Sequence, residues 1–411
     1  MEPLLKVENL RIELKGVASV LDRSCLWRSA ACFTELTAAS LRVMVADSGE
    51  SEPEEDPDQK SLLQFPIRVE APLLRVDELD VEWPGGHWRQ GQLRAGVMLF
   101  DSTLQIDGGE ISDAMLQVMP SAGEQPTQPL VLPEIFLPLN LVVNGLTLDG
   151  FEAAVGEQIE AVDSLGLVGQ WRAHDLHLDS LAISSHRGEI AVNGDLAFVD
   201  DWPLMVSADL GTLHVDDYGA HTVDARLQGD FSSANLKLQA RGTFTGVLDA
   251  DLDLLSPGVS FRGGMTLALA EDREIADFVD LPQAASELAL LSPVVAQVEG
   301  DLSRQRFAFE AEVRGVGYEQ LQLRAEGTHG DGVVLLETLG LRDAVSDSSL
   351  SASVSVDYRD QLAIRAAFTS TGLALPQLGG PLAGRLRGNG ELSFGMPMGS
   401  WQFGASALDL Q

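Results

Sequence analysis

The stretch EIAVNGDLAF, residues 189–198, alternates polar and apolar side chains along most of its length. The same alternation occurs in LNLVV (residues 139–143) and DLHLD (residues 175–179), and it dominates the sequence after residue 64. Because neighbouring side chains of a β-strand point to opposite faces, each run predicts a strand with one buried face. The chain is therefore predicted to be all-β.

Turn-forming residues recur between these runs, about every eight to twelve residues. They occupy residues 107–109, 144–145, 187–188, 193–195, 228–230 and 329–332. This spacing predicts a long meander of antiparallel hairpins. One or two short helices are expected to interrupt it, because residues 24–33 place apolar side chains at helical spacing and residues 275–291 break the strand pattern.

The sequence divides into five expected segments. Residues 1–47 hold strands and the short helix, and residues 48–63 are an acidic, Pro-punctuated stretch that predicts a disordered loop. Residues 64–131 and 132–215 form two similar β modules, each opening with a short apolar-Pro-apolar run. Residues 216–411 continue the β pattern, with an interruption near 275–291.

The composition is strongly acidic. Lys and Arg total 27 against 62 Asp and Glu, which gives a formal net charge of -35. Such a surface repels phosphate backbones, so nucleic acid is not expected as a partner. Two interpretations of the acidic residues remain open: they solvate the outer face of a sheet whose other face is apolar, or they steer a substrate by charge.

The two cysteines and the ends of the sequence bear on the cellular location of the protein. Cys25 and Cys32 alone cannot form a zinc site, and both a disulfide bridge and two buried thiols fit their spacing. The sequence contains no apolar stretch of about 18 residues and does not begin with a signal peptide. We expect either a cytoplasmic protein or a piece of a longer one, and the last residues, which stop within a strand pattern, favour a piece.

No catalytic or cofactor motif is recognisable, so we expect no enzyme, no cofactor and no metal. His174 and His177 stand three apart on a predicted strand and point to opposite faces, which prevents them from sharing a metal. Asp249, Asp251 and Asp253 share one strand face, but a straight strand spaces them about 6.6 Å apart. A solvated outer face is the better interpretation of this row than a calcium site.

The apolar face is the main candidate for function. It has no predicted covering layer, so it either packs on itself as a sandwich or folds into a trough that holds acyl chains. The candidate lining residues are Leu139, Leu141, Val143, Leu146, Leu148, Leu165, Leu167, Leu176, Leu178, Leu181, Ile183, Ile190, Val192, Leu196 and Phe198.

Several short motifs at characteristic distances resemble the repeated core of the TamB family, within the AsmA-like superfamily. They are LPEI (residues 132–135), LPL (137–139), GLTL (145–148), LGL (165–167), LHL (176–178), GEI (188–190), GDL (194–196), WPL (202–204), LLKVENLRI (4–12) and LPQLGGPLAG (375–384). The resemblance covers most of the chain but includes no catalytic signature.

The resemblance implies an elongated antiparallel sheet folded into a U-shaped hydrophobic trough, a β-taco. It also implies a periplasmic protein of a Gram-negative bacterium that is tethered to the inner membrane. Such a protein shields acyl chains as phospholipid moves between the inner and outer membranes. The implied partner is a TamA-like outer-membrane barrel protein. An alternative is a scaffold for the assembly of outer-membrane β-barrel proteins or autotransporters. The inner-membrane anchor and the domain that meets the barrel protein are expected in parts of the protein missing from this sequence.

Overall fold

The computed structural model describes residues 5–7, 10–21, 30–45, 61–83, 85–118, 130–156, 158–215, 219–270, 288–315, 317–359, 362–375, 384–395 and 402–406. These residues form strands, turns and loops, and none of them lies in a helix. The predicted all-β class is therefore confirmed. The helix predicted at residues 24–33 is wrong for residues 30–33, which begin strand β4 (Ala30–Ala38), and residues 24–29 lie outside the described residues.

Two other expectations fall largely on residues that the structure does not describe. The acidic loop at 48–63 is described only at residues 61–63, and the interruption at 275–291 only from residue 288 onward. Within the latter, Ala289–Leu290 form the short strand β20.

The chain divides into two compact units. Unit 1 comprises Met1–Glu124, Val131–Leu213 and Gln228–Asp230, and unit 2 comprises Gln125–Leu130, His214–Leu227 and Phe231–Gln411. The strands of unit 1 are β1 (Leu5–Val7), β2 (Leu10–Lys15), β3 (Ala18–Leu21), β4, β5 (Ser40–Val45), β6 (Phe65–Val76), β7 (Leu79–Trp83), β8 (Gly86–Gln90), β9 (Leu93–Asp101), β10 (Thr103–Val118), β11 (Leu137–Val155), β12 (Gln158–Ala173), β13 (Asp175–Ser185), β14 (Gly188–Ala197) and most of β15 (Leu204–Val215).

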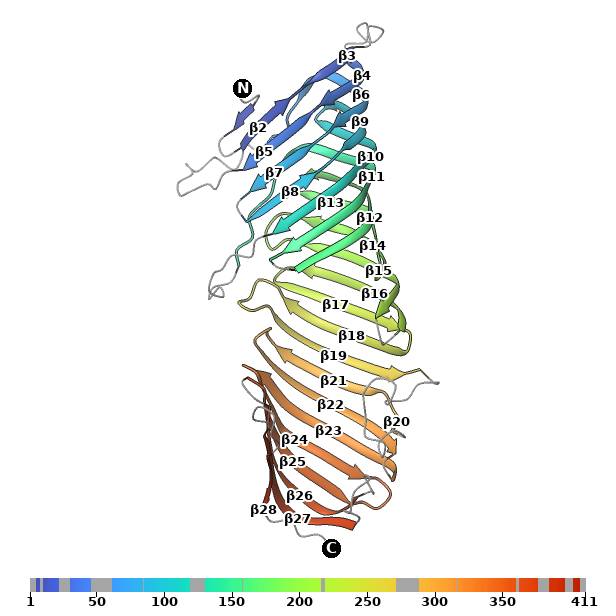
Figure 1. Cartoon of the computed structure of the whole chain (residues 1–411), viewed down its shortest axis with the longest axis vertical. Helices are drawn as coiled ribbons and strands as arrows, with labels where there is room; N and C mark the ends of the chain where they lie inside the picture. The colour runs from blue at the N-terminus through green and yellow to red at the C-terminus, as the bar shows by residue number, and fades with distance from the viewer. Residues whose placement is uncertain are drawn as a thin grey trace. The chain divides into compact units, whose positions relative to one another are not determined.

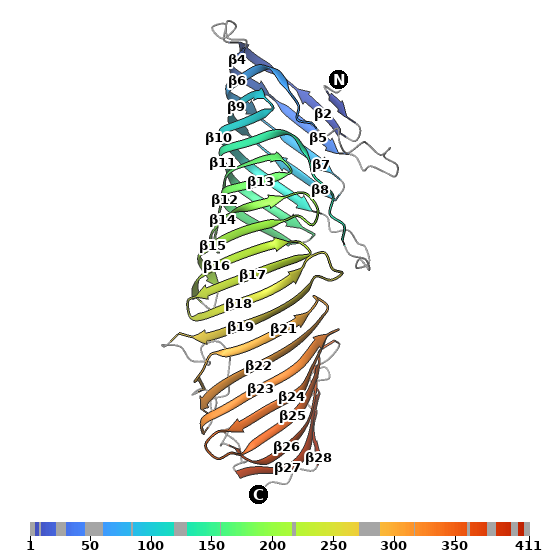
Figure 2. The same ribbon diagram turned by 180° about the vertical axis from the view of Figure 1, so that it is seen from behind.

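Unit 2 contains the remaining strands. They are most of β16 (Gly219–Asp230), then β17 (Ser233–Arg241), β18 (Phe244–Asp253), β19 (Ser260–Leu269), β20, β21 (Val294–Gly300), β22 (Arg304–Gly315), β23 (Tyr318–Gly330), β24 (Val333–Asp343), β25 (Ser349–Asp357), β26 (Ala363–Leu375), β27 (Gly384–Gly395) and β28 (Gln402–Ser406). Each described pairing from β17 to β28 is antiparallel, as the meander predicts. Figure 1 shows β17 to β23 side by side in this unit, and Figure 2 shows the same strands from behind.

Unit 1 departs from a simple meander at three strand pairs. Strand β4 pairs parallel with β6, β5 with β7, and β10 with β11. Parallel neighbours cannot be joined by a tight turn, because the chain must return to the starting end of the first strand. The chain therefore returns to the starting end of the sheet between β5 and β6 and between β10 and β11.

Half of the predicted turns are instead bends inside strands. Residues 187–188, 228–230 and 329–332 lie at hairpins, as predicted. Residues 107–109, 144–145 and 193–195 lie within β10, β11 and β14, where neighbouring strands shift register. Such β-bulges insert an extra residue, which bends the strand and increases its twist.

The bends of unit 1 are aligned across neighbouring strands. Val143 of β11 pairs with Gly169 of β12, which pairs with Leu178 of β13, and that residue pairs with Gly194 of β14. Gly194 has a φ of 156°, and a Cβ there would lie 2.3 Å from the carbonyl oxygen of Met205. Only glycine fits this position, so the sequence marks a line along which the sheet folds.

Candidate functional site

The predicted lining residues of β11 to β14 share one face of unit 1, and the strand register aligns them in rows that run across the sheet. The rows are Leu141–Trp171–Leu176–Leu196–Leu204, Val143–Gly169–Leu178–Gly194–Val206, Leu146–Leu167–Leu181–Val192–Ala208, and Leu148–Leu165–Ile183–Ile190–Leu210. A cross-strand row brings side chains within about 5.5 Å of one another at each step. The apolar surface is therefore continuous over five strands.

Two predicted lining residues stand apart from these rows. Leu139 lies near the start of β11, where the pairing with β12 is irregular, and Phe198 follows the end of β14. The Phe198 ring is 4.9 Å from the Trp171 ring and 4.9 Å from the Trp202 ring, measured between centroids. Phe198 thus extends the first row into an aromatic cluster at one end of the strands.

Alanine exposures show which face of the sheet is the more covered one. Ala71 and Ala95 share the face of the apolar rows and are 3% and 5% exposed, whereas Ala182 and Ala191 on the other face are exposed. Since these side chains are equal in size, the difference reports how closely their neighbours converge. We call the covered, apolar face the inner face and the other the outer face.

The inner face of unit 1 is covered only in part. Val143, Leu148 and Phe198 are buried, and the other twelve predicted lining residues are half-buried. No large side chain among the described residues is fully buried. This is the exposure expected of a curved sheet without a second layer packed on it.

A similar face in unit 2 was not among the predicted lining residues. One of its rows is Leu238–Leu248–Met265–Ala296–Phe309–Ala325–Leu339–Ala352–Phe368, and the next is Leu236–Ala250–Gly263–Val298–Phe307–Gly327–Leu336–Val354–Ala366. Alternation in strands such as FAFEAEV (residues 307–313) was the signal that could have found it.

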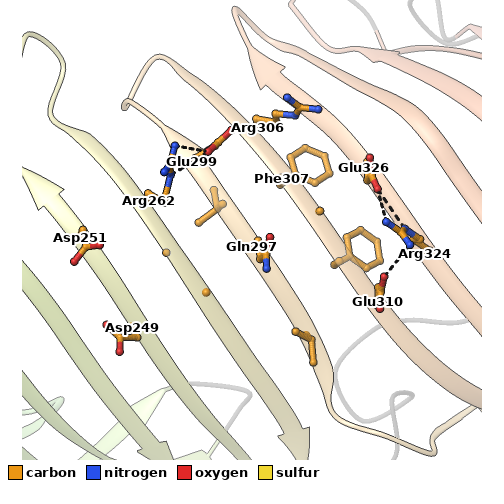
Figure 3. A pocket seen from close by; sticks show the side chains of 16 residues that line it. Asp249, Asp251, Arg262, Gln297, Glu299, Arg306, Phe307, Glu310, Arg324 and Glu326 are labelled. Carbon is orange, nitrogen blue, oxygen red and sulfur yellow. Dashed lines mark hydrogen bonds and ion pairs between the residues drawn. The ribbon is translucent and has the colours of Figure 1, made fainter.

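The outer face of unit 2 carries charged side chains in opposite-sign pairs. A depression of about 970 Å³ over β18 to β23 is lined by such pairs (Figure 3). Arg262 lies 3.1 Å from Glu299, and Arg324 lies 3.3 Å from Glu310 and 2.8 Å from Glu326. The depression is open, and two of its three arginines pair with three of its five carboxylates, so it has the character of a solvated surface.

The aspartate row on β18 belongs to the same outer face. The amide nitrogen of Asn235 donates to Asp249 at 2.9 Å and to Asp251 at 3.0 Å, and Asp253 instead accepts the backbone N–H groups of Leu255 and Ser256 in the next turn. Asp249 and Asp251 thus share one donor, whereas Asp253 turns to the backbone of the next turn, so the three carboxylates do not converge on one point.

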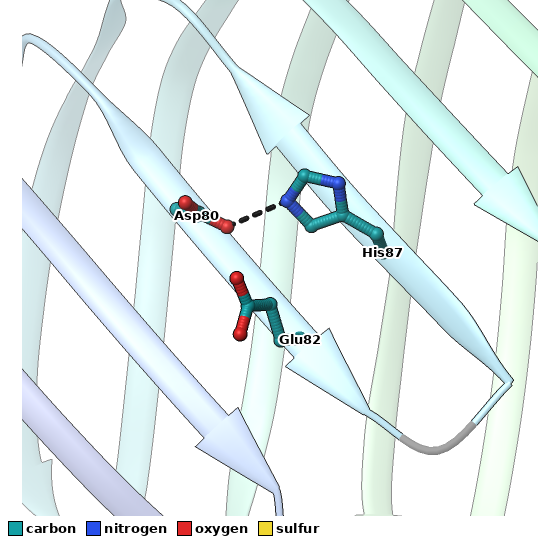
Figure 4. A group of neighbouring side chains, drawn as sticks. All are labelled: Asp80, Glu82 and His87. Carbon is teal, nitrogen blue, oxygen red and sulfur yellow. Dashed lines mark hydrogen bonds and ion pairs between the residues drawn. The ribbon is translucent and has the colours of Figure 1, made fainter.

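One group of three potential metal ligands occurs in the part of the chain that the structure describes. Ligand atoms of Asp80, Glu82 and His87 lie within 4.8 Å of one another on the hairpin of β7 and β8 (Figure 4). His87 is 2.7 Å from Asp80, and the Arg42 guanidinium is 3.2 Å from Asp80 and 3.3 Å from Glu82. Because that guanidinium already compensates both carboxylates and would repel a cation, we assign no metal to the group.

The two histidines at the β12–β13 junction have separate partners. His174 lies 2.9 Å from the Ile135 carbonyl and 3.2 Å from Glu134, whereas His177 lies 2.6 Å from Asp195 and 3.3 Å from Asp179. The hydrogen bond with Asp195 raises the pKa of His177 above its ordinary value. The structure thus gives them no common ligand position.

Cys32 is 6% exposed and disulfide-bonded, and Cys25 lies outside the described residues. No helix in the described ranges has the length and apolarity to span a membrane.

The amino-acid sequence that forms these rows matches a known protein family. The model of the TamB N-terminal domain matches residues 5–411. The chain belongs to the TamB family. No curated protein and no solved structure matches the chain.

Family membership places the chain in a TamB-like envelope protein. TamB proteins are transport and assembly modules and are not known as enzymes. The sequence resemblance to this family is thereby confirmed.

Proposed function

We propose that this chain is the groove-forming section of a TamB-like envelope protein and that it shields acyl chains during phospholipid transport between the inner and outer membranes. The observation that carries the proposal is the continuity of the apolar rows, which cross from strand to strand without a covering layer. The predicted lining residues are assigned to the groove on this basis.

The mechanism is passive shielding. A chain of about 16 carbons that crosses water exposes roughly 12 kcal/mol of apolar surface, at about 0.8 kcal/mol per methylene. A continuous lining of Leu, Ile and Val removes most of that barrier, since each strand lies only about 4.8 Å from the next. The polar headgroup stays in solvent at the open edge of the sheet.

The proposed setting is taken from the family. We place the protein in the periplasm, tethered to the inner membrane, with a TamA-like outer-membrane barrel protein as partner and phospholipid as cargo. The acidic outer face fits this setting because it keeps the sheet soluble and away from anionic headgroups.

Adjacent residues of β14 offer a direct test. Val192 lies on the inner face and is half-buried, whereas Ala191 lies on the outer face and is exposed. With a photo-crosslinking amino acid at either position, phospholipid should be captured at residue 192 and not at residue 191. Capture of an unfolded barrel-protein peptide, with no lipid at either position, would favour the assembly scaffold.

A charge on the groove wall provides the functional test. Leu178→Asp or Leu141→Asp should abolish phospholipid transfer between vesicles, because an unpaired carboxylate in an apolar lining costs several kcal/mol. Leu141→Val should transfer normally, and Ala182→Asp places the same charge on the outer face of β13 as a matched control. Equal transfer by all four variants would rule out the conduit.

A further inference from the structure

The residues that lead into β11 lie along one rim of unit 1. Residues 131–136 (VLPEIF) belong to no strand. The Ile135 N–H donates to the Phe198 carbonyl at 3.1 Å, and His174 Nδ1 donates to the Ile135 carbonyl at 2.9 Å. Since His174 lies between β12 and β13, and Phe198 between β14 and β15, this segment lies against two successive strand connections. We call residues 131–136 the rim strap.

The rim strap adjoins the end of the first apolar row. Phe198 extends that row, and it is only 8% exposed because the Trp171 and Trp202 rings both pack against it. The Trp202 ring meets it edge to face, with the centroids 4.9 Å apart. The Trp202 indole N–H in turn donates to the Pro133 carbonyl at 3.0 Å. The rim strap therefore holds one of the two rings that cover Phe198.

The rim strap is attached without a buried side chain of its own. Val131 is 87% exposed, and none of residues 131–136 is buried. Its other attachment is His174, which lies 3.2 Å from Glu134 and contacts the Phe136 ring at 5.1 Å between centroids. Segments that bury few apolar side chains open at a low cost in free energy. The rim strap can thus detach while the strands stay folded.

Backbone strain occurs at both attachments. Trp202 has a φ of 52°, and Ala173, directly before His174, has a φ of 50°. A residue with a Cβ rarely adopts this left-handed conformation, and a bulky one does so least readily. Trp202 is held in it by its backbone N–H, which donates to the Val199 carbonyl at 2.9 Å, and by the indole hydrogen bond to Pro133. Loss of the second contact therefore favours movement of Trp202 away from Phe198.

We propose that the rim strap and Trp202 form a lateral gate through which an acyl chain enters the inner face of unit 1. This inference rests on the proposed function and assigns one point of entry to the groove. In the closed arrangement Trp202 packs on Phe198 and blocks the end of the first row. When the hydrogen bond between Trp202 and Pro133 breaks, the rim strap and the indole move outward. An acyl chain then enters beside Leu196, and its headgroup stays in solvent at the rim.

The test measures how fast lipid enters unit 1 of the full chain. Vesicles of phosphatidylcholine, which carry no net charge to repel the acidic protein, contain a trace of the same lipid with a photoreactive group on one acyl chain. Irradiation at successive times after mixing, followed by mass spectrometry, gives the initial rate of capture at the peptide containing Leu196. The peptide containing Phe309 is the internal reference, because its row belongs to unit 2.

Trp202→Phe opens the gate with a minimal change. It keeps an aromatic ring against Phe198 and removes the N–H that donates to Pro133. We expect capture at the Leu196 peptide to become about fivefold faster, which corresponds to a hydrogen bond worth about 1 kcal/mol. The reason is a larger population of the open state. Capture at the Phe309 peptide should keep its wild-type rate.

A covalent tether tests the gate in the opposite direction. Glu134→Cys and His174→Cys together place two thiols across the contact between the rim strap and the rim, and a short bis-maleimide joins them. Cys32 does not react because it is disulfide-bonded. The bridged protein should lose fast capture at the Leu196 peptide. The matched control is the same protein with each thiol capped separately by N-ethylmaleimide, which should capture at least as fast as the wild type.

Three results would overturn the gate. They are a wild-type rate at the Leu196 peptide in Trp202→Phe, equal rates there in the bridged and the capped protein, and an equal change at the Leu196 and Phe309 peptides. If neither peptide captures lipid in any of these proteins, the proposed function itself is wrong. Capture at both peptides that does not respond to any change in the rim strap leaves the groove in place and removes only the gate.

Discussion

The inner faces of the two units are built from different side chains. In unit 1 the row through Leu148 consists of branched aliphatic residues on every strand from β11 to β15. In unit 2 the row through Ala325 alternates small residues with larger ones, and it places Phe309 and Leu339 on either side of that alanine. Both faces are apolar. Side chains of similar size form this row in unit 1, whereas small and large side chains alternate along the row in unit 2.

This difference shows two ways to shield apolar side chains from solvent on a sheet that has no covering layer. Leu148 is 4% exposed because it packs with Ile111 and Ala114 in the buried cluster of unit 1. Ala325 is 0% exposed, and its cross-strand neighbours on both sides are the larger Phe309 and Leu339. Unit 1 should therefore be sensitive to the loss of volume at such positions, and unit 2 to its gain.

The largest effect is expected from Leu148→Ala. It removes a buried branched side chain and should lower the free energy of unfolding of unit 1 by about 3 kcal/mol. Amide hydrogen exchange of β11 to β13 measures the loss, with Leu339→Ala on half-buried β24 as the matched change in unit 2. Equal losses in the two units would remove the distinction between them.

The second-largest effect tests the glycines at which the sheets bend. Gly194→Ala in unit 1 and Gly327→Ala in unit 2 each place a Cβ 2.3 Å from a carbonyl oxygen of the next strand, so the backbone must move. We expect each to cost about 2 kcal/mol, seen as faster exchange on both strands of the pair. Gly166→Ala is the control, since its Cβ would find its nearest neighbour at 3.9 Å. If Gly166→Ala exchanges as fast as the other two, the close contacts do not define the bends.

A smaller effect should follow from filling the shallow position of unit 2. Ala325→Leu must displace Phe309 and Leu339, which we expect to cost about 1 kcal/mol because the open face lets them move outward. Ala182→Leu on the outer face of unit 1 adds the same volume in solvent and should change little. Thermal unfolding of both variants gives the comparison, and an unchanged melting temperature for Ala325→Leu would show that its neighbours do not enclose it.

Sequence alone could predict the strands and the apolar face of unit 1, because both depend on local alternation of side chains. It could not tell a turn from a bend: the Asn-Gly pairs at 144–145 and 193–194 suit hairpins, yet here they lie within β11 and β14. Whether a turn or a bend forms at such a pair depends on pairing with strands that are distant in sequence. The parallel pairs of β4 with β6 and β10 with β11 have the same non-local origin.

The candidate site was predicted only in part for a related reason. Large aliphatic residues make the rows of unit 1 visible in the sequence, whereas the rows of unit 2 include Ala296, Ala325 and Ala352, which a search for bulky side chains passes over.

The smallest effects concern pH and should have opposite signs in the two units. The hydrogen bond with Asp195 raises the pKa of His177 above 6.5, so this pairing stabilises unit 1 fully below pH 6.5 and the contribution is lost as pH rises through the raised pKa. Hydrogen bonds from Arg359 lower the pKa of Asp357 from 3.8 to about 2, so that contribution is present above pH 3.8 and is lost as pH falls toward 2. Both groups are half-buried and remain accessible to solvent, so each shift in melting temperature should be small. The melting temperature of His177→Gln should approach that of the wild type as pH rises, and that of Asp357→Asn should approach it as pH falls. Parallel pH profiles for the two variants would contradict the assignment of these pairs, because the two pKa shifts require the differences from wild type to vanish at opposite ends of the pH range.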